Sequence, residues 1–364
     1  MKLDDHEFRL LREYIRDECG ITLGPDKKYL VESRLGGLLG ELECRSFADL
    51  HRKAVEDRTR RVRDRIVDAM TTNETLWFRD GEPFRVLRER LFPAWCEEIR
   101  AGKRERIRTW CAACSTGQEP YSIAITWLEY CRLNPEAPRE ALAILATDIS
   151  ESALAQAEAG AYNAVEMERG LDPAVRDRWF TREGRNWRIK DEVRAFVTFR
   201  RFNLQDSLAP LGSFTAVFLR YVAIYFDTPF KRDLFDRIAR VLEPGGVLFL
   251  GASESLAGHS DAFETVQEGR AVWYVPRGTG EAARWAPSAA RATKSPAEGS
   301  RPQVEPRNEA PAAPACPVAA SRPPAAKSGG LDRAEHEALL RRLREMRERT
   351  LARIGRGGSG KKED

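Results

Sequence analysis

Short apolar runs alternate with helix-like segments through the middle of this chain of 364 residues, and this alternation is what most restricts its fold. The strand candidates are residues 107–111, 143–147, 195–200, 215–219 and 247–251. Helices are expected between them, at residues 120–130, 151–159 and 231–241. Strands and helices in alternation predict an α/β domain built on a mostly parallel, doubly wound sheet.

The chain before this region has a different pattern. Residues 1–72 carry apolar side chains at helical spacing, Phe8 and Leu11 among them, and predict a small N-terminal domain of about four helices. Ser46 is the expected N-cap of one of these helices. The α/β domain is assigned to residues 73–277.

The C-terminal part of the chain has a different composition. Residues 278–330 are rich in proline and alanine and hold few large apolar groups, so they cannot offset the entropy cost of ordering, and a disordered linker is predicted. Residues 331–355 have the pattern of an amphipathic helix. Such a helix either docks on its own domain or on a pathway partner, or remains solvated.

The most informative loop follows the first strand candidate. Residues 110–121 read Trp-Cys-Ala-Ala-Cys-Ser-Thr-Gly-Gln-Glu-Pro-Tyr and lead from a strand into a helix. At such a junction α/β proteins bind nucleotide-like ligands, because small residues admit the ligand and N–H groups at the helix start point into the crevice. The glycine pattern of a dinucleotide site and the lysine of a P-loop are both missing. Glu119 suits a ligand that carries positive charge. The small residues expected to give room are Ala112, Ala113, Ser115 and Gly117.

Bulk properties exclude several classes of protein. The 60 basic and 56 acidic residues give a net charge of +4, which does not call for nucleic-acid binding. No apolar run is long enough for a membrane helix and the N-terminus lacks a signal-peptide segment, so a cytoplasmic location is expected. The seven cysteines predict reduced thiols. Cys111 and Cys114 form a C-x-x-C pair that has no second pair beside it, so two small buried residues are expected rather than a zinc or redox site.

Several further segments accompany the loop, in a fixed order. They are Thr72-Asn73-Glu74-Thr75, Phe78-Arg79-Asp80, Ala146-Thr147-Asp148-Ile149, Phe202-Asn203-Leu204, Arg220 through Ile224-Tyr225-Phe226-Asp227, and Gly251-Ala252-Ser253-Glu254-Ser255. Together they resemble the CheR family of chemotaxis receptor methyltransferases, over roughly residues 5–277.

The resemblance implies a fold and an activity. The fold is that of a Class I S-adenosylmethionine-dependent methyltransferase, Rossmann-like, with an N-terminal all-α domain. An antiparallel β subdomain is expected at residues 160–194, and a late hairpin, 263–267 with 271–275, would supply the antiparallel strand. The activity is protein-glutamate O-methylation in a chemosensory pathway. The substrate is the helical bundle of a chemoreceptor, and the product of the cofactor is S-adenosylhomocysteine.

The resemblance also implies site residues. Those that match cofactor-contacting positions are Asn73, Thr75, Arg79, Glu119, Asp148, Asn203, Leu204, Tyr221 and Val222. Tyr225 is expected to face the transferred methyl group, in a catalytic position. No metal is expected. Because a glutamate carboxylate is already ionised near pH 7, with an ordinary pKa of about 4.3, methyl transfer to it needs no general base. It needs alignment of the reacting atoms and exclusion of water.

Each of these residues also has a simpler interpretation. Asp148, expected to accept the ribose hydroxyls, would also make a good N-cap for the following helix. Arg79, expected to pair with the methionine carboxylate, could form a surface ion pair with Asp80. Glu119 could be an ordinary acidic residue in the first turn of a helix. Asn203 and Leu204, expected beside the adenine, could form a plain turn, and Tyr225 could be a half-buried core residue.

The chain departs from the family pattern at two places. Tyr221 stands where the family usually has asparagine, which leaves cofactor affinity or acceptor geometry open. Gly36 and Gly37 stand where basic residues commonly face the receptor. Lys27, Lys28, Arg34 and the arginines from Arg58 to Arg65 remain as candidate receptor contacts or as a solvated face. These departures favour an alternative, a catalytically degraded CheR-like scaffold that acts through its C-terminal helix.

Overall fold

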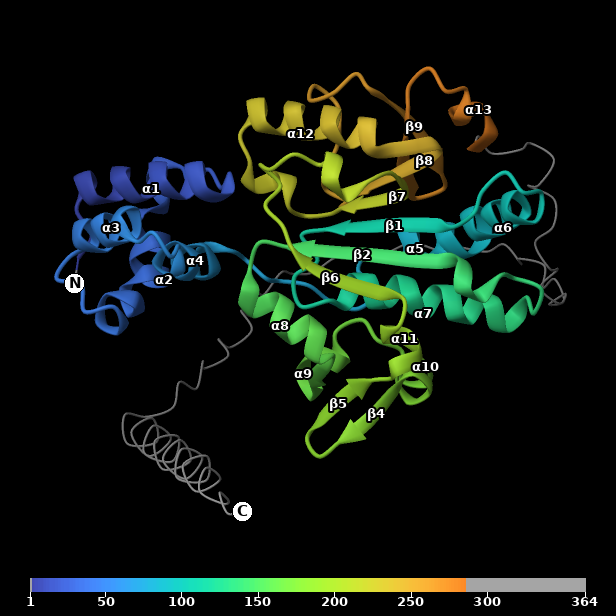
Figure 1. The fold of residues 1–364 in the computed structure, drawn as a ribbon, viewed down its shortest axis with the longest axis horizontal. Helices are drawn as coiled ribbons and strands as arrows, with labels where there is room; N and C mark the ends of the chain where they lie inside the picture. Colours follow the sequence, from blue (N-terminus) through green and yellow to red (C-terminus); the bar gives the residue numbers. More distant parts are fainter. Residues whose placement is uncertain (1, 286–364) are drawn as a thin grey trace, which may run out of the picture. The chain divides into compact units, whose positions relative to one another are not determined.

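In the computed structural model, residues 2–285 are described, and Figure 1 shows their fold. The predicted tail helix and most of the predicted linker lie outside the described residues. The described part of that linker includes a short helix, α13 (Glu281–Trp285), and the Trp285 side chain packs in the hydrophobic core.

Four helices form the N-terminal domain, as the sequence predicts. They are α1 (Asp5–Cys19), α2 (Lys28–Glu41), α3 (Phe47–Glu56) and α4 (Arg61–Met70), with a 3₁₀ turn, η1 (Pro25–Lys27), before α2. The expected cap is present, since the Ser46 side chain accepts a hydrogen bond from the Asp49 N–H at 3.0 Å. Helix α1 ends at Gly20, whose left-handed φ of 76° few other residues adopt readily. The apolar faces of the four helices meet in one separate core.

A seven-stranded sheet forms the centre of the second part, in the order β6-β2-β1-β7-β8-β10-β9. Its members are β1 (Ile107–Ala112), β2 (Leu142–Asp148), β6 (Val197–Arg201), β7 (Phe214–Leu219), β8 (Leu242–Leu250), β9 (Phe263–Glu268) and β10 (Ala271–Pro276). All five predicted central strands are present, and they pair in parallel. The late hairpin is also confirmed, since β10 pairs antiparallel with both β8 and β9.

Helices cover both faces of this sheet. Helix α7 (Gln118–Leu133) packs in one core cluster, which takes Ile107 and Cys111 from β1. Helix α12 (Thr228–Val241) packs in the other cluster, which takes Trp110 and Ala112 from the same strand. Because side chains alternate along a strand, β1 contributes to both cores, and the doubly wound prediction is confirmed.

The predicted subdomain is a separate three-stranded antiparallel sheet. Its order is β3 (Ala161–Asn163), β5 (Asn186–Ile189), β4 (Phe180–Glu183). The short helices α9 (Ala164–Glu168), α10 (Pro173–Trp179) and α11 (Asp191–Arg194) lie in the same segment. The helix before it, α8 (Glu151–Ala159), has the predicted bounds.

Two features differ from the sequence pattern. A continuous helical segment that the pattern did not show, α5 (Glu82–Val86), η2 (Leu87–Leu91, a π turn) and α6 (Phe92–Arg100), precedes β1. Pro244-Gly245-Gly246, whose composition is typical of a turn before a strand, lies instead inside β8, where the register against β7 shifts. A Cβ on Gly246 would come within 2.8 Å of the Glu243 carbonyl oxygen, so the irregularity itself requires glycine. The remaining 3₁₀ turns are η3 (Arg139–Ala141), η4 (Ala209–Leu211) and η5 (Ala223–Tyr225).

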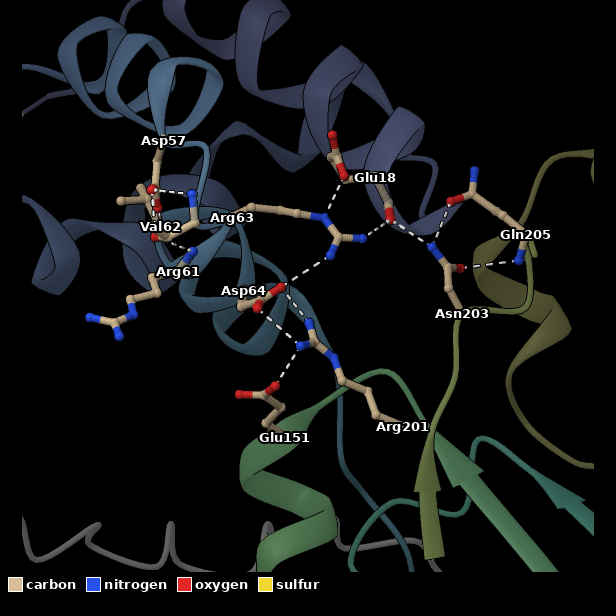
Figure 2. Close-up of polar contacts among 11 residues, drawn as sticks. Glu18, Asp57, Arg61, Val62, Arg63, Asp64, Glu151, Arg201, Asn203 and Gln205 are labelled. Carbon is tan, nitrogen blue, oxygen red and sulfur yellow. Dashed lines mark hydrogen bonds and ion pairs between the residues drawn. The ribbon is translucent and has the colours of Figure 1, made fainter.

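A polar network joins the helical domain to the sheet (Figure 2). Arg201, at the end of β6, pairs with Asp64 of α4 and with Glu151 of α8. Arg63 bridges Asp64 to Glu18 of α1. These contacts tie α1 and α4 to the edge of the sheet at which the carboxyl ends of the parallel strands lie. No helix among the described residues is long and apolar enough to cross a membrane.

The two departing glycines of α2 lead to a stability prediction. Gly36 and Gly37 are exposed and helical, and a Cβ on either would meet no atom within 4 Å. Replacing both with alanine should therefore raise the free energy of unfolding, by about 1 kcal/mol per site, measured by chemical denaturation. Gly20→Ala is the matched control, since its Cβ would lie 2.8 Å from the Phe230 ring and its φ is left-handed, so this change should destabilise. A double variant no more stable than the parent would contradict the prediction.

Candidate functional site

One cavity lies at the carboxyl ends of β1, β2 and β7. Its lining includes every residue assigned a cofactor or catalytic role from the sequence: Asn73, Thr75, Arg79, Glu119, Asp148, Asn203, Leu204, Tyr221, Val222 and Tyr225. These residues come from five separate segments, and the parallel topology is what brings them together. Ligand sites of open α/β sheets lie at this edge.

Asp148 ends β2 and is only 6% exposed. One carboxylate oxygen accepts the Ser115 N–H at 2.7 Å and the other accepts the Ser150 N–H at 2.9 Å. It is not the N-cap of α8, because Ser150 occupies that position and accepts the Ala153 N–H. Burial raises the pKa of Asp148, although the two backbone bonds oppose the shift. Each oxygen keeps a free lone pair, so the carboxylate can accept two neighbouring hydroxyl groups.

The loop after β1 is held by the segments beside it. The Ser115 hydroxyl donates to the Asn73 carbonyl oxygen at 2.9 Å, so the loop is tied both to Asp148 and to the segment before the sheet. Ala113 and Ser115 have left-handed φ angles of 60° and 51°, a conformation rare for side-chain-bearing residues and often found at functional sites. Ala113 and Ser115 line the cavity as expected, whereas Gly117 does not.

Gly117 has a packing role instead. It precedes α7 with a φ of 90°, and a Cβ there would lie 2.9 Å from the Ala157 Cβ of α8. The Tyr162 hydroxyl donates to the neighbouring Thr116 carbonyl oxygen at 2.8 Å. The glycine therefore allows α7, α8 and the subdomain to pack together. Ala112 likewise lies in a core cluster and not in the lining of the cavity.

Arg220 forms a buried ion cluster at the end of β7. Its side chain is 2% exposed and pairs with Glu119 at 2.9 Å and with Asp80 at 2.7 Å. It also donates to the Arg79 carbonyl oxygen at 2.6 Å. Burial raises the pKa of Glu119 while Arg220 opposes the shift. Glu119 is thus more than a first-turn acid, since it is one of two carboxylates that neutralise a buried guanidinium.

Arg79 is arranged differently from Arg220. It does not pair with its neighbour Asp80, whose carboxylate is taken by Arg220 and by the Tyr221 hydroxyl. Its guanidinium lies over the Tyr221 ring, with Cζ 3.6 Å from the ring centroid, and donates to the Glu74 carbonyl oxygen at 3.1 Å. Within residues 2–285, no carboxylate forms an ion pair with it. Arg79 therefore keeps donors for an anionic ligand in the cavity.

The other predicted residues line the cavity in different ways. The Asn203 side-chain amide donates to the Glu18 carbonyl oxygen at 2.9 Å and so is engaged with the helical domain (Figure 2). Its backbone and the buried Leu204 remain as the part that can meet a ligand. Val222 directly precedes η5 and Tyr225 is its last residue; the Tyr225 carbonyl oxygen accepts the Thr22 N–H at 2.8 Å.

Some lining residues were not found from the sequence. Cys19 and Ile21 lie at and just after the end of α1, and Met70 and Thr71 at the end of α4. No local pattern marks them, because only the docking of the helical domain brings them to the cavity. Arg220 was quoted within a motif but given no role. A charged residue directly after a largely apolar strand would have indicated its position.

Cys111 and Cys114 are both buried free thiols, as expected for small residues beside the loop. Burial raises the pKa of each. In the described part of the chain, no group of three or more His, Cys, Asp and Glu side chains could hold a metal ion.

Two family models cover most of the described chain. The model of the CheR methyltransferase all-alpha domain matches residues 6–71, and that of the CheR methyltransferase SAM binding domain matches residues 73–272. The chain belongs to the CheR methyltransferase family. The sheet with its antiparallel β10 is thus a Class I methyltransferase fold, and the cofactor of this CheR protein is S-adenosylmethionine.

Curated relatives agree with this assignment. The CheR chain is 44% identical to chemotaxis protein methyltransferase 1 of Pseudomonas aeruginosa over 268 residues, which are 73% of this chain and 96% of that protein. It is 47% identical to the chemotaxis protein methyltransferase of Vibrio anguillarum over 266 residues, 73% of this chain and 94% of that protein. It is 30% identical to the chemotaxis protein methyltransferase of Borreliella burgdorferi, over 70% of this chain and 90% of that protein.

The cavity fits this cofactor chemically. Asp148 offers a buried acceptor pair for vicinal hydroxyls, and Arg79 offers unused N–H donors for a carboxylate. The strained loop at Ala113 brings backbone against the ligand space, and Leu204 and Val222 offer apolar surface for a base. These roles for individual residues are taken further below.

The shifted pKa of Asp148 predicts how cofactor affinity depends on pH. Protonation of Asp148 removes an acceptor, and burial raises its pKa. Affinity for S-adenosylhomocysteine should therefore fall at a higher pH than it would with an ordinary aspartate, whose pKa is about 3.9. Folding should not fail through this residue, because a raised carboxyl pKa favours the folded state at low pH. Calorimetric titrations between about pH 8 and about pH 4, close to the pKa of an ordinary aspartate, measure this.

The control for this prediction is Asp148→Asn. It should bind more weakly and with a flatter pH profile, and whatever dependence remains belongs to Glu119, whose pKa is also raised by burial. An affinity of the parent chain that does not change over the whole interval would contradict the prediction.

Proposed function

We propose that this CheR protein methylates glutamate side chains of chemoreceptors to γ-glutamyl methyl esters, with S-adenosylmethionine as the methyl donor. The observation that carries the proposal is that Asp148, Arg79 and Tyr225 line one cavity. Asp148 offers two carboxylate oxygens as acceptors, and Arg79 offers a guanidinium that forms no ion pair within the described residues. The curated relatives named chemotaxis protein methyltransferase support the pathway. A cytoplasmic location belongs to the same proposal, because the expected substrate is the cytoplasmic helical bundle of the receptor.

Individual residues have separate tasks in this proposal. Asp148 accepts the ribose hydroxyls, and Arg79 binds the methionine carboxylate. Glu119, neutralised by Arg220, shapes the wall between them, with Asn73 and Thr75 on the facing segment. Asn203, through its backbone, and Leu204, Tyr221 and Val222 complete the pocket.

The chemistry requires little acid–base assistance from the chain. The bound sulfonium supplies an activated methyl group, and the acceptor carboxylate is already ionised. What the chain provides is alignment and exclusion of water. Tyr225, half-buried in the wall, is the side chain proposed to face the reacting centre. The residues from α1 and α4 narrow access to the cavity from the side of the helical domain.

The basic residues proposed for receptor contact fall into two groups. Arg34 has a structural task, since it donates to the Met70 and Thr71 carbonyl oxygens at the end of α4. Arg63 and Arg65 pair with carboxylates of the helical domain. Arg58, Arg60 and Arg61 are exposed and form no ion pair within the described residues, and they are the better candidates for an acidic receptor surface. Lys27 and Lys28 are each paired with an aspartate at the surface.

The alternative of a degraded scaffold has no support in the described residues. Glycines at 36 and 37 remove no contact of the cavity, and Tyr221 lies in the cavity wall without displacing Arg79, Glu119 or Asp148 from it. The C-terminal helix through which such a scaffold would act lies outside the described residues.

A transfer assay tests the proposal. The full chain is incubated with methyl-labelled S-adenosylmethionine and membranes that carry chemoreceptors, and methanol released by mild base is counted, since methyl esters are base-labile. Asp148→Ala should lower the initial rate at subsaturating cofactor by about 100-fold, because two hydrogen bonds to a charged group are lost.

Asp261→Ala is the matched control. This aspartate is exposed and lies in no lining of the cavity, so its variant should transfer methyl groups like the parent. Label that resists base, or label on receptors whose candidate glutamates have been replaced by alanine, would contradict glutamate as the acceptor.

A further inference from the structure

Tyr221 occupies a backbone conformation that disfavours its own residue type. It follows Arg220 at the end of β7, and its φ is 59°. The left-handed region suits glycine and asparagine, whereas a residue with a bulky ring is strained there. A tyrosine held in this conformation therefore has contacts that compensate.

Those contacts fix the tyrosine on three sides. Its hydroxyl lies 2.7 and 2.9 Å from the two carboxylate oxygens of Asp80 and donates to that group. Its backbone N–H donates to the Glu254 side chain at 2.5 Å. The ring lies against Gly251, where a Cβ would come within 2.9 Å of both δ carbons. The side chain is therefore a fixed platform in the cavity wall.

Arg79 lies on this platform. Its guanidinium carbon is 3.6 Å from the ring centroid, which is the distance of direct stacking between a planar cation and an aromatic face. The residues on both sides of Arg79 have left-handed backbones, with φ of 47° at Phe78 and 69° at Asp80. The turn, the ring and the Glu74 carbonyl oxygen together hold the guanidinium at the cavity.

Arg220 does not depend on the ring in the same way. Its guanidinium is 5.8 Å from the ring centroid and is fixed by Glu119, Asp80 and the Arg79 carbonyl oxygen. Asp80 keeps a lowered pKa: partial burial would raise it, but the bonds from Tyr221 and Arg220 outweigh that effect. Loss of the ring should therefore release Arg79 and leave the buried cluster in place.

We propose that Tyr221 is a positioning residue for Arg79. Its ring supports the guanidinium and its hydroxyl anchors Asp80, so that Arg79 presents its free N–H groups to the carboxylate of the cofactor's methionine part. The inference rests on the cofactor-binding roles given to Arg79 and Asp148 in the proposed function. It accounts for a tyrosine at a position where asparagine would fit the backbone more easily.

Two ligands separate this role from a merely structural one. S-adenosylhomocysteine carries the carboxylate, whereas 5′-methylthioadenosine keeps the adenosine part and lacks the amino-acid part. Dissociation constants for both are measured by calorimetry on the full chain, with thermal unfolding of each variant as a check on folding. The comparison of the two ligands reports on the contacts of the amino-acid part, whose carboxylate the proposed function assigns to Arg79.

Tyr221→Leu should weaken binding of S-adenosylhomocysteine by about tenfold, the effect of one cation–π contact away from water, and leave 5′-methylthioadenosine within about twofold. Tyr221→Phe keeps the aromatic ring under Arg79, so it should lose less affinity for S-adenosylhomocysteine than Tyr221→Leu. Tyr221→Asn, which suits the left-handed backbone, should lose affinity like the leucine variant while remaining folded. Arg79→Met should reproduce the loss, and the Tyr221→Leu, Arg79→Met double variant should add little to it.

Two results would overturn the inference. One is an equal loss for both ligands in the leucine and asparagine variants, and the other is unchanged affinity for S-adenosylhomocysteine in them. Failure of the proposed function gives a different pattern, in which the parent chain binds neither ligand, or in which Asp148→Ala binds both as the parent does.

Discussion

The ion pairs of the buried Arg220 guanidinium with Glu119 and Asp80 are the interactions on which the cofactor cavity depends. The guanidinium joins the end of β7 to α7 through Glu119 and to the segment before the sheet through Asp80. A charge buried to this degree is tolerated only when it is paired, so the two carboxylates and the strand end must keep their places together. The positions of Arg79 and Tyr221 follow from this cluster, since one supplies a carbonyl oxygen to Arg220 and the other shares Asp80 with it.

A second set of polar contacts places the helical domain at the same edge of the sheet. Arg201 connects α4 with the end of β6, and the Asn203 amide connects the following loop with α1. The helical domain thereby contributes Cys19, Ile21 and the end of α4 to the cavity. The docking of the helical domain therefore completes part of the cavity wall.

Much of this arrangement could be predicted from local sequence. The apolar runs marked the five parallel strands, and the position of Asp148 at a strand end placed it at the ligand edge, because carboxyl ends of parallel strands meet there. Other features could not be predicted, because they depend on contacts between distant segments. The packing of Gly117 against Ala157 is one example, and the stacking of Arg79 on Tyr221 is another. The α5–α6 segment was not predicted although Phe92, Trp95 and Cys96 have helical spacing, because the π turn η2 and the proline in the first turn of α5 and of α6 interrupt the helical period.

The central claim is that the cavity binds S-adenosylmethionine with the Asp148 carboxylate on the ribose. The most direct test is calorimetric titration of the purified full chain with S-adenosylhomocysteine, beside Asp148→Ala and the exposed control Asp261→Ala. The account predicts saturable one-to-one binding by the parent and the control, and a loss of about 100-fold in Asp148→Ala. Equal affinity of all three proteins, or no binding by the parent chain, would contradict it.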